Sequence, residues 1–372
     1  MLELNFNFQS ALDILGLLQG LTLGVLLIAM NFRHSRSTCL LGLYLLLFSL
    51  KLLIFIPGGL GLDEKFPEWF LLPFDFSWLL FAVFFIYTQQ ISIFSEQKTK
   101  YWLLYPGILS FMLQVYIYFQ PYPAKVEIAQ SYWYELVFTF AGILYSWIIG
   151  IWNLRLLEKH RIEVENTFSE LENKLLTWIR IYLIYSIISS VFIHILYIIS
   201  PDNYYFKIIF SILDLVAIYW VAIHGMKQQN VLSILGKRDS GTLINYKAGL
   251  MESMRSTRND SQDLKELMEA IDSYMIKSEV FLNSELTIVD LADKLNIHPK
   301  RISASINTVS KQNFNTYINE LRIKKAKRIL NDTNTHNFSI EGIGQEVGFH
   351  SKSAFYAAFK KVTGTTPTKY KE

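Results

Sequence analysis

The chain has 372 residues, of which 51% are hydrophobic, 15% aromatic and 18% charged, and its formal net charge is +3. Soluble globular proteins carry about 25% charged residues, so this composition excludes an ordinary soluble protein, and the apolar content excludes general disorder. The single cysteine, Cys39, excludes an intramolecular disulfide framework and a cysteine-based zinc cluster.

Seven apolar runs are long enough to cross the roughly 30 Å of hydrocarbon in a bilayer as helices of about 20 residues. A large soluble helical core would instead need polar outer faces at the helical period, which these runs mostly lack. The sequence therefore predicts a seven-span transmembrane sensor domain over residues 1–226. The predicted spans are residues 11–31, 38–56, 70–94, 102–119, 133–154, 176–199 and 204–226.

Lys and Arg are distributed unevenly over the loops between these runs. The first, third and fifth loops hold eight of them, whereas the second, fourth and sixth hold three. Cytoplasmic loops are enriched in Lys and Arg, so an odd number of spans puts the N-terminus outside and everything after Met226 in the cytoplasm. The stretch before Ala11 has no Lys or Arg, which disfavours a cleaved signal peptide.

The rest of the chain is polar and is predicted to fold in water. Residues 227–263 contain three glycines and are predicted to be a cytoplasmic linker. The linker leads into a helix over residues 263–277. Residues 264–372 form the third predicted part, a cytoplasmic domain of helices. Because the bundle is also helical, the expected fold class is all-α.

Two helix-turn-helix patterns follow, about fifty residues apart. In the first, a helical pattern over residues 286–295 ends at Asn296, and a second helix from His298 buries Ile302 and Ile306. In the second, a pattern over residues 340–347 ends at Gly348, a turn residue able to adopt positive φ. A helix after Gly348 is predicted to bury Phe355 and Phe359.

A helix over residues 314–330 is predicted to connect the two units. Leu321, Ala326 and Ile329 lie on one face, and five basic residues are expected along the rest: Arg322, Lys324, Lys325, Lys327 and Arg328. From Lys294 onward the chain holds 14 Lys and Arg against 5 Asp and Glu. A surplus of this size is an electrostatic footprint for a polyanion.

These residues resemble a known family. The string GFHSKSAFYAAFKKVTGTTPTKY resembles the second helix-turn-helix of AraC type transcription regulators, and LTIVDLADKLNIHPKRI and FNTYINELRIKKAKRIL resemble the rest of the same domain. The resemblance covers residues 281–370. Two positions depart from it: Lys311 stands where the family usually has Gly, and Gly344 where it usually has Ala.

The combined layout resembles membrane-anchored AraC type (AraC/XylS) regulators with seven transmembrane helices. The resemblance implies double-stranded DNA, RNA polymerase and a second copy on DNA as partners, and no cofactor or metal. It also implies a multi-pass protein of the bacterial inner (cytoplasmic) membrane. Two recognition helices in one domain suit successive major-groove faces about 34 Å apart.

The resemblance places base contacts on the outward faces of the two recognition helices. Lys can donate to guanine, Asn can pair with adenine, and Ala can contact only a thymine methyl group. Arg301, Lys325, Lys360 and Lys361 are expected on phosphates, although each is equally interpretable as a solvated surface charge. The expected base-contacting residues are Lys300, Ser303, Ala304, Asn307, Lys352, Ser353, Tyr356 and Ala357.

Five ionisable residues inside the spans are candidate ligand-sensing residues, because charges are costly in hydrocarbon. They are Lys51, Asp75, Glu135, His194 and Asp214, all in the outer half of the predicted bundle. One interpretation is a polar pocket open to the outside that holds a small molecule of unknown identity. The other is snorkelling or pairing within the bundle, such as Lys51 with Asp75.

An enzyme is not expected, because the chain has no Gly-rich phosphate loop, no Gly-x-Ser-x-Gly motif and no paired His at zinc spacing. The predicted function is a membrane-bound one-component transcription regulator that senses an external or membrane signal and binds specific DNA through two helix-turn-helix units. The alternative is a seven-helix receptor or transporter whose cytoplasmic helical tail binds a protein partner.

Overall fold

The computed structural model describes residues 6–31, 35–63, 65–200, 203–228, 230–231, 261–331 and 339–371. The chain divides into two compact units, one of Met1–Glu158 with Leu176–Asn230 and the other of Lys159–Leu175 with Val231–Glu372. Over the described ranges the regular structure is helical, apart from one isolated bridge between Phe168 and Thr287. The expected all-α class is confirmed for this part of the chain.

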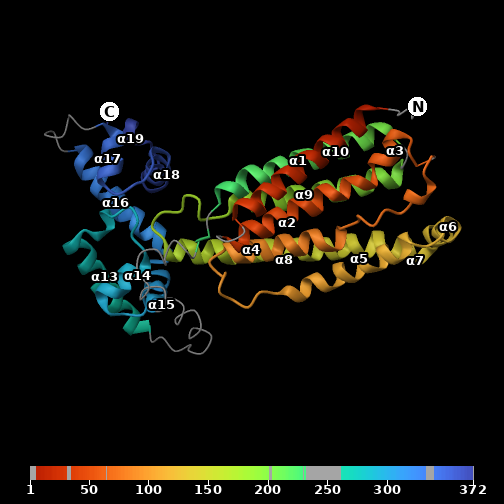
Figure 1. The fold of residues 1–372 in the computed structure, drawn as a ribbon. Helices are drawn as coiled ribbons and strands as arrows, with labels where there is room; N and C mark the ends of the chain where they lie inside the picture. Colours follow the sequence, from red (N-terminus) through yellow and green to blue (C-terminus); the bar gives the residue numbers. More distant parts are fainter. Residues whose placement is uncertain are drawn as a thin grey trace. The chain divides into compact units, whose positions relative to one another are not determined.

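The first unit is a bundle of long apolar helices (Figure 1). Its α-helices are α1 (Phe8–Asn31), α2 (Arg36–Lys51), α3 (Ile56–Leu60), α4 (Ser77–Ile91), α5 (Tyr105–Tyr118), α6 (Tyr122–Gln130), α7 (Tyr132–Tyr134), α8 (Gly142–Thr167, shared with the second unit), α9 (Thr177–Ile199) and α10 (Tyr204–Lys227). Short 3₁₀ segments are η1 (Leu52–Ile54), η2 (Pro67–Trp69) and η3 (Tyr101–Leu104), and η4 (Glu135–Ala141) is a π-helix.

Among the described residues, five helices are long and apolar enough to cross a membrane by length and composition: Phe8–Asn31, Arg36–Ile54, Tyr132–Thr167, Thr177–Ile199 and Tyr204–Lys227. The predicted third and fourth spans, residues 70–94 and 102–119, contain shorter helices, α4 with 15 residues and α5 with 14. At 1.5 Å per residue each is only about 22 Å long. The count of seven is therefore not established.

Local capping and proline explain why these two helices are short. The backbone N–H of Ser77 donates to Asp75 Oδ1 at 2.9 Å, so α4 starts well inside the apolar run. Pro106 lies in the first turn of α5, where a missing N–H is tolerated. An apolar run consists of residues that tolerate lipid. Hydrogen bonds at helix starts and prolines determine which residues of the run are helical.

The α1–α2 contact brings two backbones close together. Gly24 and Gly42 face each other: a Cβ on Gly24 would lie 2.9 Å from the Gly42 carbonyl oxygen, and one on Gly42 would lie 2.8 Å from the Gly24 carbonyl. Gly20 and Gly16 lie about one and two turns earlier on the same face and are also buried. Small residues at four-residue spacing are the usual means of close helix packing in membranes.

In the second unit, α16 lies between the two helix-turn-helix units (Figure 1). The elements are α13 (Ser261–Ser278), η5 (Val280–Leu282), α14 (Ile288–Leu295), α15 (Pro299–Ser305), η6 (Ile306–Ser310), α16 (Phe314–Asn331), α17 (Ile340–Glu346), α18 (Lys352–Thr363) and α19 (Pro367–Lys371). The helix predicted over residues 263–277 is confirmed as α13. Most of the predicted linker, residues 227–263, lies outside the described residues.

The chain turns between η6 and α16 at Lys311, which has φ 55° and ψ 33°. This left-handed conformation is strained for any residue with a Cβ and free of strain for Gly. Lys311, which stands where the resemblance leads one to expect Gly, thus adopts a backbone conformation that favours Gly.

Replacing Lys311 with Gly should therefore stabilise this turn by about 1 kcal/mol, because the strain of the left-handed Lys disappears. The measurement is hydrogen exchange of the backbone amides of η6 and α16 in the full chain, where about fivefold more protection is expected. Lys311→Ala is the control, since it removes the side chain and keeps the strain. Equal protection in the two variants would contradict this explanation.

Candidate functional site

The first helix-turn-helix is fixed by local capping. The Thr287 side chain accepts the N–H of Asp290, and the Asp290 carboxylate accepts the N–H of Thr287, which closes a capping box at the start of α14. Asn296 ends this helix with φ 53°, as its breaker role predicts. Ile302 and Ile306 are fully buried, so the opposite face of α15 and η6 is the one that can face a ligand.

The second helix-turn-helix turns at Gly348. Its φ is +94°, and a Cβ there would lie 2.5 Å from the carbonyl oxygen of Leu282, so the predicted need for glycine is confirmed. The Ser351 side chain caps α18 by accepting the N–H of Ala354. Phe355 and Phe359 are fully buried against α16 and α17, as expected.

The structure also explains why residue 344 is glycine. A Cβ at this buried position of α17 would lie 2.9 Å from the ring of Phe355. The departure from the usual Ala is thus accommodated by an aromatic ring that packs directly onto the helix backbone.

None of the ten residues predicted to contact DNA from the two recognition helices is buried. Arg301, Asn307, Lys352, Ser353, Ala357 and Lys360 are exposed, and Lys300, Ser303, Ala304 and Tyr356 are partly exposed. The Asn307 amide donates to Ser303 Oγ at 3.2 Å, and the Tyr356 hydroxyl lies 3.2 Å from Thr368 Oγ1. The predicted contact faces are therefore available, and whether they bind DNA stays a prediction.

Several basic residues of this surface form ion pairs within the unit. Arg301 Nη2 lies 2.5 Å from Asp263 Oδ2, and Lys325 Nζ lies 2.6 Å from Glu279 Oε2. Lys352 donates to Glu341, and this hydrogen bond raises the pKa of Lys352. All three pairs are solvent-exposed and therefore weak, so phosphates can compete for the same cations.

Arg322 does not belong to the basic outer face on which the sequence placed it. Its side chain is fully buried. Phe314, Ile318, Arg322, Ala326 and Leu330 recur every four residues along α16, and all five are buried. The sequence contains this four-residue spacing, but the prediction followed the charge of Arg322 and placed it on the exposed face. That assignment is wrong.

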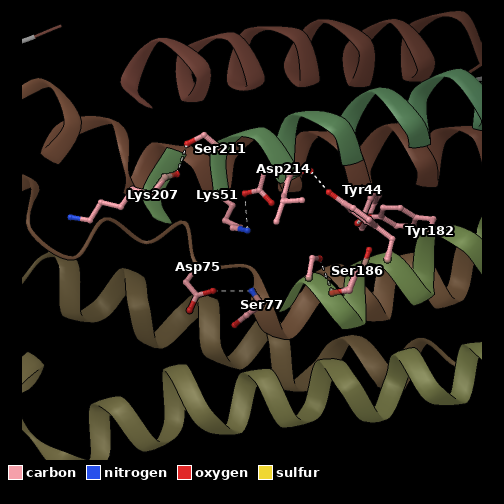
Figure 2. A network of polar contacts seen from close by, with 12 residues as sticks. Tyr44, Lys51, Asp75, Ser77, Tyr182, Ser186, Lys207, Ser211 and Asp214 are labelled. Carbon is pink, nitrogen blue, oxygen red and sulfur yellow. Dashed lines mark hydrogen bonds and ion pairs between the residues drawn. The ribbon is translucent and has the colours of Figure 1, made fainter. Parts of the chain in front are cut away.

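Inside the first unit, the structure brings two of the five candidate sensing residues together. Lys51 Nζ lies 3.2 Å from Asp214 Oδ2, a contact between the end of α2 and α10 (Figure 2). The pairing considered from sequence, Lys51 with Asp75, is replaced by this one, and Asp75 Oδ1 instead accepts the backbone N–H of Ser77 at the start of α4. Glu135 is exposed at the start of η4, and His194 Nδ1 contacts the carbonyl oxygen of Ser190 in its own helix.

Asp13 on α1 belongs with this pair, although it was not among the five predicted sensing residues. Its side chain is buried, accepts a hydrogen bond from Gln9, and lies within electrostatic range of Asp214 and Lys51. Further along the bundle, the hydroxyls of Tyr44 and Tyr182 hydrogen-bond to each other (Figure 2). Asp214 was predicted because ionisable residues inside a span are costly. The same argument applies to Asp13, which lies inside the first predicted span.

Comparison with known proteins gives a family for the C-terminal part alone. A family model described as a helix-turn-helix domain matches residues 291–372. The chain is 31% identical over 87 residues to the melibiose operon regulatory protein of Escherichia coli (strain K12), which is 23% of this chain and 28% of that protein. It is 28% identical over 109 residues to the "uncharacterized HTH-type transcriptional regulator YobQ" of Bacillus subtilis (strain 168), which is 28% of this chain and 44% of that protein.

The chain spans less than half the length of the curated relatives that it matches. No solved structure matches it. The C-terminal part thus matches a helix-turn-helix domain model and is weakly similar to transcription regulators. These relatives are regulators and not enzymes, in agreement with the expectation from the sequence.

The Lys352–Glu341 pair generates a prediction. Replacing Glu341 with Gln should raise affinity for DNA several-fold, because Lys352 no longer has a competing carboxylate and the surface loses one negative charge. The measurement is duplex binding by the full chain. Glu346→Gln, an exposed change on the same helix, removes the same charge away from Lys352 and should have a smaller effect; equal effects would refute a specific role for the pair.

The Lys51–Asp214 pair generates a second prediction. Asp214→Asn should change resting target transcription about fivefold or more, the ratio that about 1 kcal/mol produces, because Lys51 loses its carboxylate partner inside the bundle. Adding Lys51→Met should return transcription toward the wild-type level. Asp75→Asn is the control, and unchanged transcription in all three variants at equal membrane expression would exclude a role for the pair in switching.

Proposed function

We propose that this protein is a membrane-bound one-component transcription regulator, in which an apolar helical bundle senses a signal and the C-terminal domain binds specific DNA. One observation carries the proposal. Two helix-turn-helix units share the packing helix α16, and their recognition helices expose the predicted contact residues. This arrangement suits insertion of both helices into successive major-groove faces of one duplex.

The bundle supports membrane insertion by its surface as well as by its helix lengths. Ile184, Ile188 and Ile195 on α9 are 41%, 63% and 50% exposed, and exposed apolar side chains on this scale suit lipid rather than water. We propose that α4 and α5, extended by their flanking segments, complete seven crossings. The chain would then be a multi-pass protein of a bacterial cytoplasmic membrane, with its N-terminus outside.

A contact within the second unit supports this orientation. The loop between α8 and α9 packs against the helix-turn-helix domain, and the N–H of Ser169 donates to the carbonyl oxygen of Leu286 at 3.1 Å. This loop and the domain must therefore lie on the same side of a membrane. Because DNA is cytoplasmic, the contact agrees with the independent argument from Lys and Arg in the loops.

The Asp13–Lys51–Asp214 group is the proposed point at which an external or membrane signal acts. A ligand that interacts differently with two arrangements of these charges would shift the balance between them. Dimerisation on DNA is the second proposed element, because holding two copies together raises the effective concentration to roughly the millimolar range. Contact with RNA polymerase is proposed by analogy with the family alone.

Duplex binding by the full chain in lipid nanodiscs, measured over a range of salt concentrations, tests the proposed function. If Arg301, Lys325, Lys360 and Lys361 each neutralise a phosphate, the log–log slope should be about −3 to −4. Lys300→Ala and Lys352→Ala should each weaken binding to a specific site roughly tenfold. Lys294→Ala, an exposed change of equal charge on α14, is the control, and no salt-dependent duplex binding by the wild type would overturn the proposal.

A further inference from the structure

The loop between α8 and α9 forms part of the DNA-binding unit, although more than a hundred residues separate the two in sequence. The end of α8 and this loop, Lys159–Leu175, cluster with the C-terminal domain rather than with the bundle. Phe168 forms an antiparallel bridge with Thr287, the residue that caps α14. Val164, Phe168 and Ser169 are buried in this contact, with exposures of 0%, 3% and 2%.

Polar side chains just before α16 and in its first turn bind the end of α8 and the loop that follows it. Asn315 Nδ2 donates to the carbonyl oxygen of Ser169 at 2.7 Å, and Asn313 Nδ2 donates to Glu165 Oε2 at 3.0 Å. The Ser169 hydroxyl lies 3.4 Å from the carbonyl oxygen of Ser284. Hydrogen bonds to backbone and side chains together fix both the position and the register of the loop, which distinguishes it from an incidental surface contact.

Arg322 connects this loop to both helix-turn-helix units. Its Nη2 donates to Ser169 Oγ at 3.2 Å and to the carbonyl oxygen of Asn283 at 2.8 Å, before the first unit. Its guanidinium stacks over Phe349 in the turn of the second unit, 5.5 Å from the ring centroid. Burial lowers the pKa of Arg322 to about 10, and the negative charge of Glu170 opposes that shift. A change at Ser169 therefore acts directly on the side chain that joins the two units.

The loop also borders the second recognition helix. A cavity of about 240 Å³ lies between them, with Ser169, Glu170 and Leu171 on the loop side and Ala357 and Lys361 on the α18 side. Ala357 and Lys361 are two of the residues predicted to meet DNA. The docked residues 159–175 contain four Glu against Lys159, Arg161 and Lys174, and all four Glu fall within residues 163–172. That stretch therefore adds negative charge beside a surface that must attract phosphates.

We propose that the segment Glu163–Glu172, here called the regulatory loop, is an intramolecular partner of the DNA-binding domain that holds it in a state of low DNA affinity. Its release raises that affinity. Because the regulatory loop contains the end of α8 and the first part of the connection to α9, a change in these helices can reach the domain without passing through residues 232–260. This inference rests on the proposed DNA-binding function and adds its mode of regulation.

The test compares duplex binding by the full chain in nanodiscs for two variants. Ser169→Leu removes the hydroxyl that Arg322 contacts and adds bulk at a buried point, without a change in charge and outside residues 261–371. We expect it to raise DNA affinity fivefold or more, which is the lower end of usual coupling between sites. The control is Glu172→Gln, an exposed change in the same loop, which should raise affinity less than twofold.

A cross-link tests the opposite direction. In a Cys39→Ser background, which removes the only native cysteine, Glu165→Cys and Asn313→Cys place two thiols across the contact. Oxidation should hold the loop in place and lower DNA affinity fivefold or more, and reduction should restore it. If the wild type binds duplex DNA and Ser169→Leu does not bind more tightly, or oxidation has no effect on a cross-linked chain, this inference is overturned while the proposed function stands.

Discussion

The buried guanidinium of Arg322 is the interaction on which the arrangement of the DNA-binding unit depends. A buried cation is costly unless its donors are used. Here Nε donates to the carbonyl oxygen of Phe281, and Nη2 donates to the carbonyl oxygen of Asn283 and to the Ser169 hydroxyl, whereas Nη1 has no hydrogen-bond partner among the described residues. Those acceptors come from two parts of the chain that are far apart in sequence. Because Phe349 covers the same guanidinium, one side chain sets α16, both helix-turn-helix units and the α8–α9 loop in a common geometry.

The composition implies two solvents, lipid for the apolar bundle and water for the C-terminal domain. The apolar bundle satisfies its backbone groups within helices, as lipid requires, and lets α1 and α2 approach through Gly24 and Gly42. The C-terminal domain instead uses polar caps and exposed basic residues, as water and nucleic acid require. The α8–α9 loop belongs in sequence to the bundle and in packing to the domain, so the proposed communication between the bundle and DNA binding is assigned to it.

Much of the C-terminal domain could be predicted from sequence because local rules determine it. Asn296 and Gly348 were predicted as turn residues and adopt positive φ, and the helix before the first unit begins and ends close to the predicted residues. Arg322 was misplaced because its residue type suggested solvent, while its four-residue spacing with Ile318 and Ala326 indicated burial. The conflict is settled only by acceptors from η5 and the α8–α9 loop, which no local rule brings to α16.

The bundle was less predictable for a related reason. Hydropathy identifies apolar runs, but the hydrogen bond between Ser77 and Asp75 and the proline in α5 mark where these helices begin, so two of the seven predicted spans contain short helices. Depth in the membrane singled out Lys51, Asp75 and Asp214 as candidates. It could not show that Lys51 pairs with Asp214 and that Asp75 accepts the N–H of Ser77, because pairing depends on which helices are neighbours.

Recovery of DNA from membranes tests most directly whether one chain is both membrane-embedded and DNA-binding. Cells that express the full chain would be cross-linked, their membranes isolated and washed at high salt, and the DNA attached to the protein sequenced. The account predicts a small set of enriched sites in the membrane fraction, lost when Lys300 and Lys352 are both replaced by Ala. Recovery of the full chain and its DNA only from the soluble fraction, or of DNA without site preference in both proteins, would contradict it.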